Sequence, residues 1–333
     1  MPEQLIFAME VSLNGLMTGV MYALVALGFV LIYKASGIFN YAQGVMALFA
    51  AMTLVGIQEG RVPFSHLINA IFGTELHHLP WHSVPALFAI LLTVAVMIFF
   101  AWAVQKVVFQ HLVGQEPIIL FMATIGLAYF LEGLGDLMWG SEIKTLNVGL
   151  PQGASMWIEE NTAFLGGDEF YGFFIDKLDI IAALVAAALV GALVVFAQYT
   201  KQGRAMRAVA DDHQAALSVG ISLNFIWVLV WSLAGFVALV AGVMWGAKSG
   251  VQFSLSLIAL KALPVLMLGG FTSIPGAIVG GLIIGVGEKL FEYLIGAPFL
   301  GGATENWFAY VLALLFLVFR PQGLFGEKII ERV

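Results

Sequence analysis

Cysteine is absent from this chain of 333 residues, which excludes disulfides, thiol catalysis and metal sites built on cysteine. Charged side chains are scarce as well, at 11% of the residues against about 25% in soluble domains. Hydrophobic residues make up 61%, and a globular fold cannot hide so large an apolar fraction from water. A lipid bilayer accepts apolar side chains on the protein surface. The composition therefore predicts an all-α, polytopic helical bundle inside a membrane.

Other absences narrow the function. The net charge of −7 is the opposite of the basic surface that nucleic acids attract, so no nucleic-acid partner is expected. The first ten residues, MPEQLIFAME, lack a basic n-region and a small-residue cleavage site, which predicts a retained tail. No Walker A motif, GxSxG or GxGxxG after a strand occurs. We therefore expect a chain that is not an enzyme and hydrolyses no nucleotide by itself.

Long apolar runs dominate what is present. A helix needs about 20 apolar residues to cross a bilayer, and nine segments approach this length, which predicts eight to ten membrane segments within a single domain, residues 1–333. The segments are 12–32, 38–57, 84–104, 117–138, 180–199, 225–247, 254–268, 277–295 and 306–319. The seventh contains Lys261 and Pro264, so we expect a broken or partly re-entrant helix there.

The distribution of Lys and Arg predicts the orientation, because cytoplasmic loops are enriched in them. If residues 200–224 are cytoplasmic, the inner loops carry more Lys and Arg than the outer ones. The N-terminus is then outside and the C-terminus cytoplasmic. Residues 58–83 and 139–177 become periplasmic loops, the second of them acidic.

A charge-dense stretch, GRAMRAVADDHQAALSVG, covers residues 203–220. Arg204, Arg207 and Asp211 recur at spacings of three and four, which predicts one short amphipathic helix with Gly203 and Gly220 at its ends. Such a helix could rest on lipid headgroups. Its polar face has mixed charge and small neighbouring residues, which favours docking to another protein.

Polar residues inside the apolar segments are the second group of candidates. Asn40, Tyr41, Gln43 and Gly44 follow the turn YKASG, and they either hold helices together or line a polar path. Lys261 and Glu288 are near mid-span, where ionisable residues usually pair, so we predict a structural ion pair. A proton relay is a weaker interpretation because no series of carboxylates runs across several segments.

Glycines and histidines have less specific interpretations. In KALPVLMLGGFTSIPGAIVGGLIIGVGEKL, the pairs Gly276/Gly280 and Gly281/Gly285 predict close helix crossings, and a role in substrate binding stays open. The histidines of ELHHLPWH lack a defined ligand spacing, so we interpret them as surface residues of a loop, and no metal site is expected.

As a set, LIYKASGIFNYAQG, QGRAMRAVADDHQAALSVGI, LGGFTSIPGAIVGGLIIGVGE and the terminal FRPQGLFG resemble the permease subunits of branched-chain amino acid ABC transporters. The likeness is greatest to the first of the two paired permeases. It implies a multi-pass protein of the bacterial inner membrane. The implied partners are a second, similar permease in a pseudo-symmetric heterodimer, two cytoplasmic ATPase subunits, a periplasmic solute-binding protein and the lipid bilayer. ATP and Mg²⁺ would bind the ATPase subunits, with no cofactor on this chain.

The resemblance also implies residue roles. A coupling helix within residues 201–221 would contact the ATPase through Gly203, Arg204, Arg207, Ala208, Asp211, Asp212, Ala215 and Gly220. The candidates for the translocation pathway are Asn14, Asn40, Tyr41, Gln43, Gly44, Lys261 and Glu288.

The expected function is the membrane-spanning subunit of an ATP-driven importer for branched-chain or other amino acids. The outer loops 58–83 and 139–177 look long for the family, so they either shape docking of the binding protein or reflect another substrate. One alternative is an importer of urea, short amides, or aromatic or other organic acids. An alternative of another class is a stand-alone channel or ion-coupled carrier, which would transport without an ATPase and depend on Lys261 or Glu288.

Overall fold

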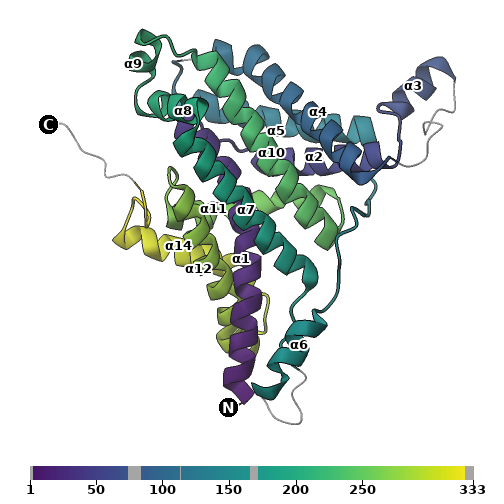
Figure 1. Cartoon of the computed structure of the whole chain (residues 1–333), viewed down its shortest axis with the longest axis vertical. Helices are drawn as coiled ribbons and strands as arrows, with labels where there is room; N and C mark the ends of the chain where they lie inside the picture. Colours follow the sequence, from purple (N-terminus) through teal and green to yellow (C-terminus); the bar gives the residue numbers. More distant parts are fainter. Residues whose placement is uncertain (1–2, 74–83, 113, 166–171, 327–333) are drawn as a thin grey trace. The chain divides into compact units, whose positions relative to one another are not determined.

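The computed structural model describes residues 3–73, 84–112, 114–165 and 172–326 (Figure 1). Within these ranges the backbone forms helices, and the only extended pairings are two isolated bridges, Lys144–Val251 and Ala154–Asp176. The prediction of a polytopic helical membrane bundle is confirmed. The structure leaves the predicted orientation of the termini as a prediction.

Apolar helices occupy all nine predicted segments. Six are long and apolar enough to cross a membrane: α1 (Glu3–Ser36), α4 (Ala86–Val107), α5 (Pro117–Trp139), α7 (Lys177–Tyr199), α10 (Leu223–Ser249), and α12 (Ile274–Phe291) with its continuation through a π-helical turn (Glu292–Gly296) and α13 (Ala297–Leu300). Three are shorter: α2 (Gln43–Gln58), the 3₁₀ turn η3 (Phe253–Leu257) with α11 (Ile258–Gly269), and α14 (Glu305–Phe319).

The seventh segment is irregular at two points. It begins as the 3₁₀ turn η3, and α11 then continues through Pro264. Proline has no N–H, so residue 264 cannot donate the helical hydrogen bond to the carbonyl of Leu260. The hydroxyl of Tyr310, on α14, donates to that oxygen at 2.6 Å. The side chain of a neighbouring helix thus satisfies the carbonyl that proline leaves open.

The chain divides into two compact units. Unit 1 comprises Met1–Val30, Leu150–Gly191 and Leu260–Val333, and unit 2 comprises Leu31–Gly149 and Ala192–Ala259. The two predicted outer loops contain short helices, namely α3 (Ser65–Phe72) in unit 2 and α6 (Met156–Thr162), followed by a 3₁₀ turn (Ala163–Leu165), in unit 1. The assignment of residues 1–333 to one functional domain stays a prediction.

In unit 2, α2 forms the core. It packs against α4, α5, α10 and η3, and all but its last two residues are buried. Such a helix is apolar all round because no face of it meets water. Close approach depends on glycine. A Cβ on Gly44 would collide with Ser256, and one on Gly56 would enter the ring of Trp139.

In unit 1, α12 uses two glycine faces. A Cβ on Gly281 would come within 2.6 Å of the carbonyl oxygen of Gly19 on α1. A Cβ on Gly280 would come within 2.6 Å of the carbonyl oxygen of Val265 on α11. The predicted close crossings are therefore confirmed, and the two small-residue pairs contact different neighbours.

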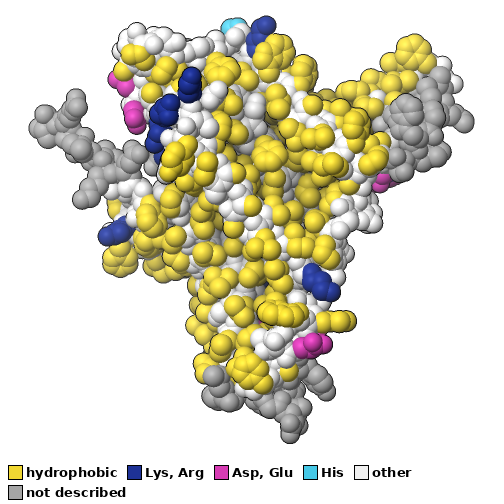
Figure 2. All heavy atoms as spheres, in the orientation of Figure 1, with side chains coloured by type: hydrophobic (Ala, Val, Ile, Leu, Met, Phe, Trp, Pro, Cys, Tyr) yellow, Lys and Arg dark blue, Asp and Glu magenta, His cyan; other side chains and the backbone are white. Residues whose placement is uncertain are grey.

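Apolar side chains also cover the outside of several helices. In α4, α5 and α7 only 33%, 28% and 22% of the most apolar stretch is buried, although these helices are strongly apolar. Figure 2 shows hydrophobic side chains over most of the face in view. Surfaces of this kind are stable against lipid tails.

The contact between Tyr310 and Leu260 gives a testable prediction. Tyr310→Phe should lower the free energy of unfolding in detergent by about 1 kcal/mol, because the Leu260 carbonyl loses its donor. In a Pro264→Ala background, residue 264 can donate to that carbonyl, so the same Tyr310→Phe change should cost much less. Thermal unfolding of the four proteins measures the cycle. Equal losses in both backgrounds would contradict this account.

Candidate functional site

The charge-dense stretch forms two short helices in unit 2, α8 (Lys201–Asp211) and α9 (His213–Ser218). The prediction of one helix over residues 203–220 is therefore wrong. The backbone of Asp212 is extended, with φ −156° and ψ 112°, and its carboxylate accepts hydrogen bonds from the N–H groups of Gln214 at 2.8 Å and Ala215 at 3.0 Å. An Asx cap of this kind starts a new helix, which breaks the periodicity that the sequence suggests.

The two glycines of this stretch have different roles. Gly220 has a φ of +84° just beyond α9, which confirms it as an end. Gly203 lies inside α8, where it is buried and where a Cβ would collide with the backbone of Phe196 and Ala197. The helix begins earlier, where the Thr200 hydroxyl caps it by accepting from the Gly203 N–H at 2.9 Å. Gly203 is thus a packing residue and not a helix end.

Charged side chains project from α8. Arg204, Arg207 and Asp211 are exposed, and among the described residues neither arginine is in an ion pair. Lys and Arg side chains gather over α8 in Figure 2. The opposite face of the segment packs on unit 2, where Val209 and Ala216 are buried.

Asp212 is committed to the backbone of α9. Hydrogen bonds from Ala215 and Gln214 hold the pKa of its carboxyl below the usual value, so it stays ionised at neutral pH. The contribution of this cap is present above the ordinary pKa of Asp, about 3.9, and is lost as the pH falls through the lower pKa of the folded protein. The ring of the next residue, His213, lies edge-on to Trp227 of α10, with centroids 6.0 Å apart.

The polar residues at the start of α2 find their partners within unit 2. Asn40 and Gln43 are fully buried, and the Asn40 amide donates to Gln43 Oε1 at 3.3 Å. The Gln43 amide donates to the carbonyl of Ala234 on α10 at 3.3 Å. Tyr41 is different, because its side chain is 37% exposed. Of the two alternatives, contacts that hold helices together fit Asn40 and Gln43.

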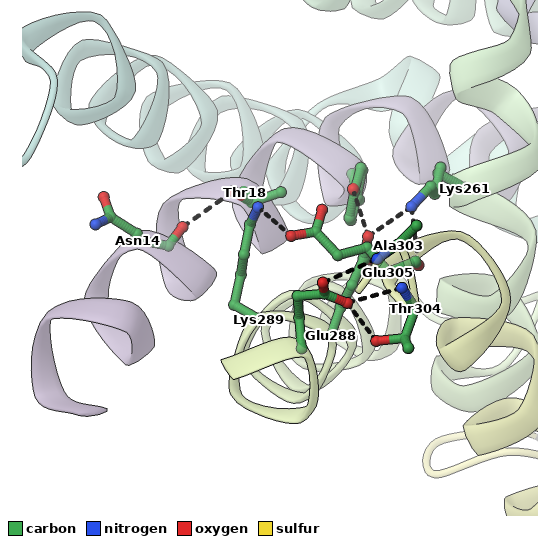
Figure 3. Close-up of polar contacts among 10 residues, drawn as sticks. Asn14, Thr18, Lys261, Glu288, Lys289, Ala303, Thr304 and Glu305 are labelled. Carbon is green, nitrogen blue, oxygen red and sulfur yellow. Dashed lines mark hydrogen bonds and ion pairs between the residues drawn. The ribbon is translucent and has the colours of Figure 1, made fainter. Parts of the chain in front are cut away.

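Charged side chains from α11, α12 and α14 of unit 1 lie close together (Figure 3). Nζ of Lys261 on α11 is 2.5 Å from Oε1 of Glu288 on α12, which confirms the predicted ion pair. The side chain of Glu288 is 1% exposed. Lys261 also donates to the carbonyl of Glu305 at 3.0 Å, and the hydroxyl of Tyr22 on α1 lies 3.4 Å from Glu288 Oε1. Asn14, also on α1, lies apart from this group in Figure 3.

A second layer of contacts ties the start of α14 to the end of α12. Lys289 Nζ is 2.8 Å from Glu305 Oε1. The carboxylate of Glu292 accepts from the backbone N–H of Ala303 at 2.9 Å and of Thr304 at 2.7 Å, and also from the Thr304 hydroxyl. These contacts pair partly buried charges and hold helices of unit 1 together. Sequence reasoning missed Tyr22 and Glu305, because the sequence carried no signal that either would face Lys261 or Lys289.

The described residues contain no group of three His, Cys, Asp or Glu side chains that could hold a metal ion. The histidines of ELHHLPWH lie outside the described residues.

Comparisons with known proteins give a consistent result. Residues 11–320 match the model of the family described as the permease component of the branched-chain amino acid transport system. The high-affinity branched-chain amino acid transport system permease proteins LivH of Escherichia coli and LivH of Salmonella typhimurium are 27% and 28% identical to the chain. The corresponding protein BraD of Pseudomonas aeruginosa is 29% identical. Each alignment covers the full length of both proteins.

The Lys261–Glu288 pair should be costly to break on one side only. Glu288→Ala leaves Lys261 without its partner, and we expect a loss of about 3–5 kcal/mol in the free energy of unfolding. The double variant Lys261→Met/Glu288→Leu removes both charges at similar volume and should recover most of that loss. Thermal unfolding in detergent tests this. A double variant as unstable as Glu288→Ala would show that the charges themselves are required.

The cap at Asp212 can be separated from its charge. Asp212→Asn keeps an N-cap acceptor and should leave α9 intact, whereas Asp212→Ala removes the acceptor and should speed amide exchange in α9 roughly fivefold. Hydrogen exchange at the amides of Gln214 and Ala215 measures the difference. Asp211→Ala, next to it and without a capping role, is the control. Equal exchange in the Asn and Ala variants would refute the capping role.

Proposed function

The chain belongs to the family of permease components of branched-chain amino acid transport systems, and on this premise we propose its substrates, partners and means of energy coupling. It is the membrane permease subunit of an importer, and a multi-pass protein of the bacterial inner membrane. We propose that it carries branched-chain or other amino acids. A periplasmic solute-binding protein delivers the substrate, and a second, similar permease completes the pathway.

Two cytoplasmic ATPase subunits supply the energy. They hold ATP and Mg²⁺, while this chain binds no cofactor and catalyses no reaction of its own. In this proposal the segment α8–α9 is cytoplasmic, the N-terminus is outside, and the loops 58–83 and 139–177 are periplasmic. The sequence supports this division of labour, because it carries no nucleotide-binding motif.

One observation carries the coupling proposal. In a chain with 11% charged residues, Arg204, Arg207 and Asp211 are exposed on a short helix between the apolar helices α7 and α10. Bare charges of mixed sign on a surface set the orientation of a partner and discriminate against wrong ones. We propose that this surface contacts an ATPase subunit, with Ala208 and Ala215 allowing close approach.

The remaining residues of the segment act indirectly. Asp212 caps α9, Gly203 lets α8 lie against the end of α7, and Gly220 ends α9. Val209 and Ala216 are buried, which anchors the segment to unit 2. When the ATPase dimer closes, a segment anchored in this way moves with its helix bundle. The displacement then switches the permease between its outward-facing and inward-facing states.

For the pathway, we propose two kinds of residue. Tyr41 and Asn14 are at least partly exposed and are the candidates for contact with the substrate. The Asn14 amide also donates to the carbonyl of Phe174 at 3.2 Å. Asn40, Gln43, Gly44, Lys261 and Glu288 shape the path indirectly, because their polar groups or their close packing are engaged by neighbouring helices.

Co-purification in mild detergent followed by reconstitution tests the function. A complex with two ATPase subunits and a second permease should take up amino acids in liposomes only with ATP and the binding protein. Flux through this chain alone, without an ATPase, would instead establish a channel or carrier.

Charge reversal on α8 tests the coupling role. Arg204→Glu/Arg207→Glu should reduce uptake at least about tenfold while the complex still folds, because like charges then face the partner. ATP hydrolysis should continue without its stimulation by the loaded binding protein. Lys34→Glu/Lys106→Glu makes the same change in net charge at exposed residues outside α8 and should leave uptake near wild type. Normal uptake in the α8 variant would refute the role.

A further inference from the structure

Unit 2 contains a cavity of about 600 Å³ at the carboxyl end of α5. One wall comes from the connection between α2 and α3, including Arg61 and Ser65. The other comes from the last turn of α5 and the residues after it, including Asp136, Ser141 and Glu142. The translocation and coupling residues described above do not line it.

The walls of this cavity are held by specific contacts. The N–H of Phe64 donates to the carbonyl of Met138 at 3.2 Å, and Phe64 has a left-handed φ of 60°. Lys144 is buried, and its Nζ donates to the carbonyls of Trp139 at 2.7 Å and Gly140 at 3.1 Å. A buried ammonium thus satisfies the end of α5, and the opposite wall is tied to the same turn. The cavity is therefore a built feature of the fold and not a gap between loops.

Negative charge predominates around the cavity. Arg61 is already engaged, with Nε 2.5 Å from Glu59 Oε2 and a terminal guanidinium nitrogen 3.8 Å from Glu142 Oε2. The Lys144 ammonium is committed to backbone carbonyls. The side chain of Asp136 is exposed, and among the described residues no hydrogen bond or ion pair engages it. Hydrogen bonds to neutral carbonyls leave the charge of Lys144 in place, so the carboxylates of Glu59, Asp136 and Glu142 stand against two cations. One negative charge is in excess, and the unpaired carboxylate of Asp136 favours a cationic ligand.

The volume and the lining of the cavity indicate the kind of cation. A bare metal ion would need several ligands close around it, whereas this space is far larger than an ion. Val62, Leu137 and Met138 add apolar surface next to Asp136. Lys and Arg side chains have this combination, an apolar stem with a charged head.

We propose that this cavity receives a Lys or Arg side chain of the periplasmic binding protein when that protein docks. The inference rests on the proposed function, because it requires the cavity to face the periplasm. Asp136 and Glu142 pair with the charged head. Arg61 repels the incoming cation from the side of the cavity next to Glu59, so the head lies toward Asp136. Exposed charges of this kind steer the encounter and fix the orientation of a docked protein.

The absence of cysteine allows a direct test of the cavity's potential. In the assembled transporter, Ser141→Cys places the only thiol of this chain in the wall, and labelling is followed on this chain. The thiolate attacks two membrane-impermeant methanethiosulfonates, one ending in trimethylammonium and one in sulfonate. Each reaction forms a mixed disulfide and releases methanesulfinate, so the ratio of the two rates cancels the reactivity of the thiol. At low salt, the ratio of the cationic to the anionic reagent's rate should be about tenfold higher at this thiol than on free cysteine. The variants Asp136→Asn and Glu142→Gln should abolish this preference. Glu116→Gln, at the other end of α5, should not.

Docking gives the second measurement. Affinity for the binding protein encoded with the transporter should fall roughly tenfold in Asp136→Asn. In the parent protein, the same affinity should fall as the salt concentration rises. Arg61→Gln should increase that affinity, because it removes the competing cation. Bound binding protein should protect the introduced thiol from both reagents. Weaker docking in Arg61→Gln, or unchanged docking in Asp136→Asn with no cationic preference at the thiol, would overturn the proposal.

The outcomes separate the two levels of inference. If the reagents reach the thiol of the Ser141→Cys variant only from the cytoplasmic side, the orientation in the proposed function is wrong. If they reach it from the periplasmic side, uptake depends on the binding protein and no charge preference appears, then only the docking site is refuted.

Discussion

The core of a bilayer contains no water, so a polar group placed there is costly unless the protein supplies its partner. This constraint explains the contacts found in both units. The carbonyl opposite Pro264 is filled by Tyr310, and Lys261 is paired with Glu288. The Gln43 amide donates to a carbonyl of α10. Several polar residues that the sequence suggested for a polar path bond to other groups of the protein, which lowers the cost of burying them.

The same constraint concentrates recognition where helices end. On α8 and around the cavity at the end of α5, charges are exposed and are not fully compensated. Both regions belong to unit 2, and α10 runs between them. His213 contacts Trp227 in the first turns of α10, and Val251, just after its end, pairs with the backbone of Lys144. A helix of 27 residues spans about 40 Å. A single continuous helix thus connects the segment proposed to bind an ATPase with the residue that holds the cavity wall.

Close packing explains how such a connection can be stiff. Gly242 on α10 has no room for a Cβ beside Ala47 of α2, and Gly44 has none beside Ser256. Backbones in direct contact have few side-chain rotamers between them that could absorb a displacement. In unit 1 the glycines of α12 allow its backbone to contact the backbones of α1 and α11 in the same way. Movement within either unit therefore means movement of whole helices.

The sequence by itself determined the class of protein, the nine apolar segments, the irregular seventh one and the Lys261–Glu288 pair. Hydrophobic length and the cost of a lone buried charge depend on composition and spacing, which are local properties. Only the structure decided that Asp212 divides the charge-dense segment, that Gly203 packs instead of capping, that Tyr22 and Glu305 join the Lys261–Glu288 pair, and that Arg61, Asp136 and Glu142 share a cavity. The last two depend on which groups from distant parts of the chain meet, whereas the first two depend on a local cap and a local close approach. A side chain that caps the backbone can divide a helix that the periodicity predicts to be continuous. A partner many residues away cannot be recognised from the local spacing of residues.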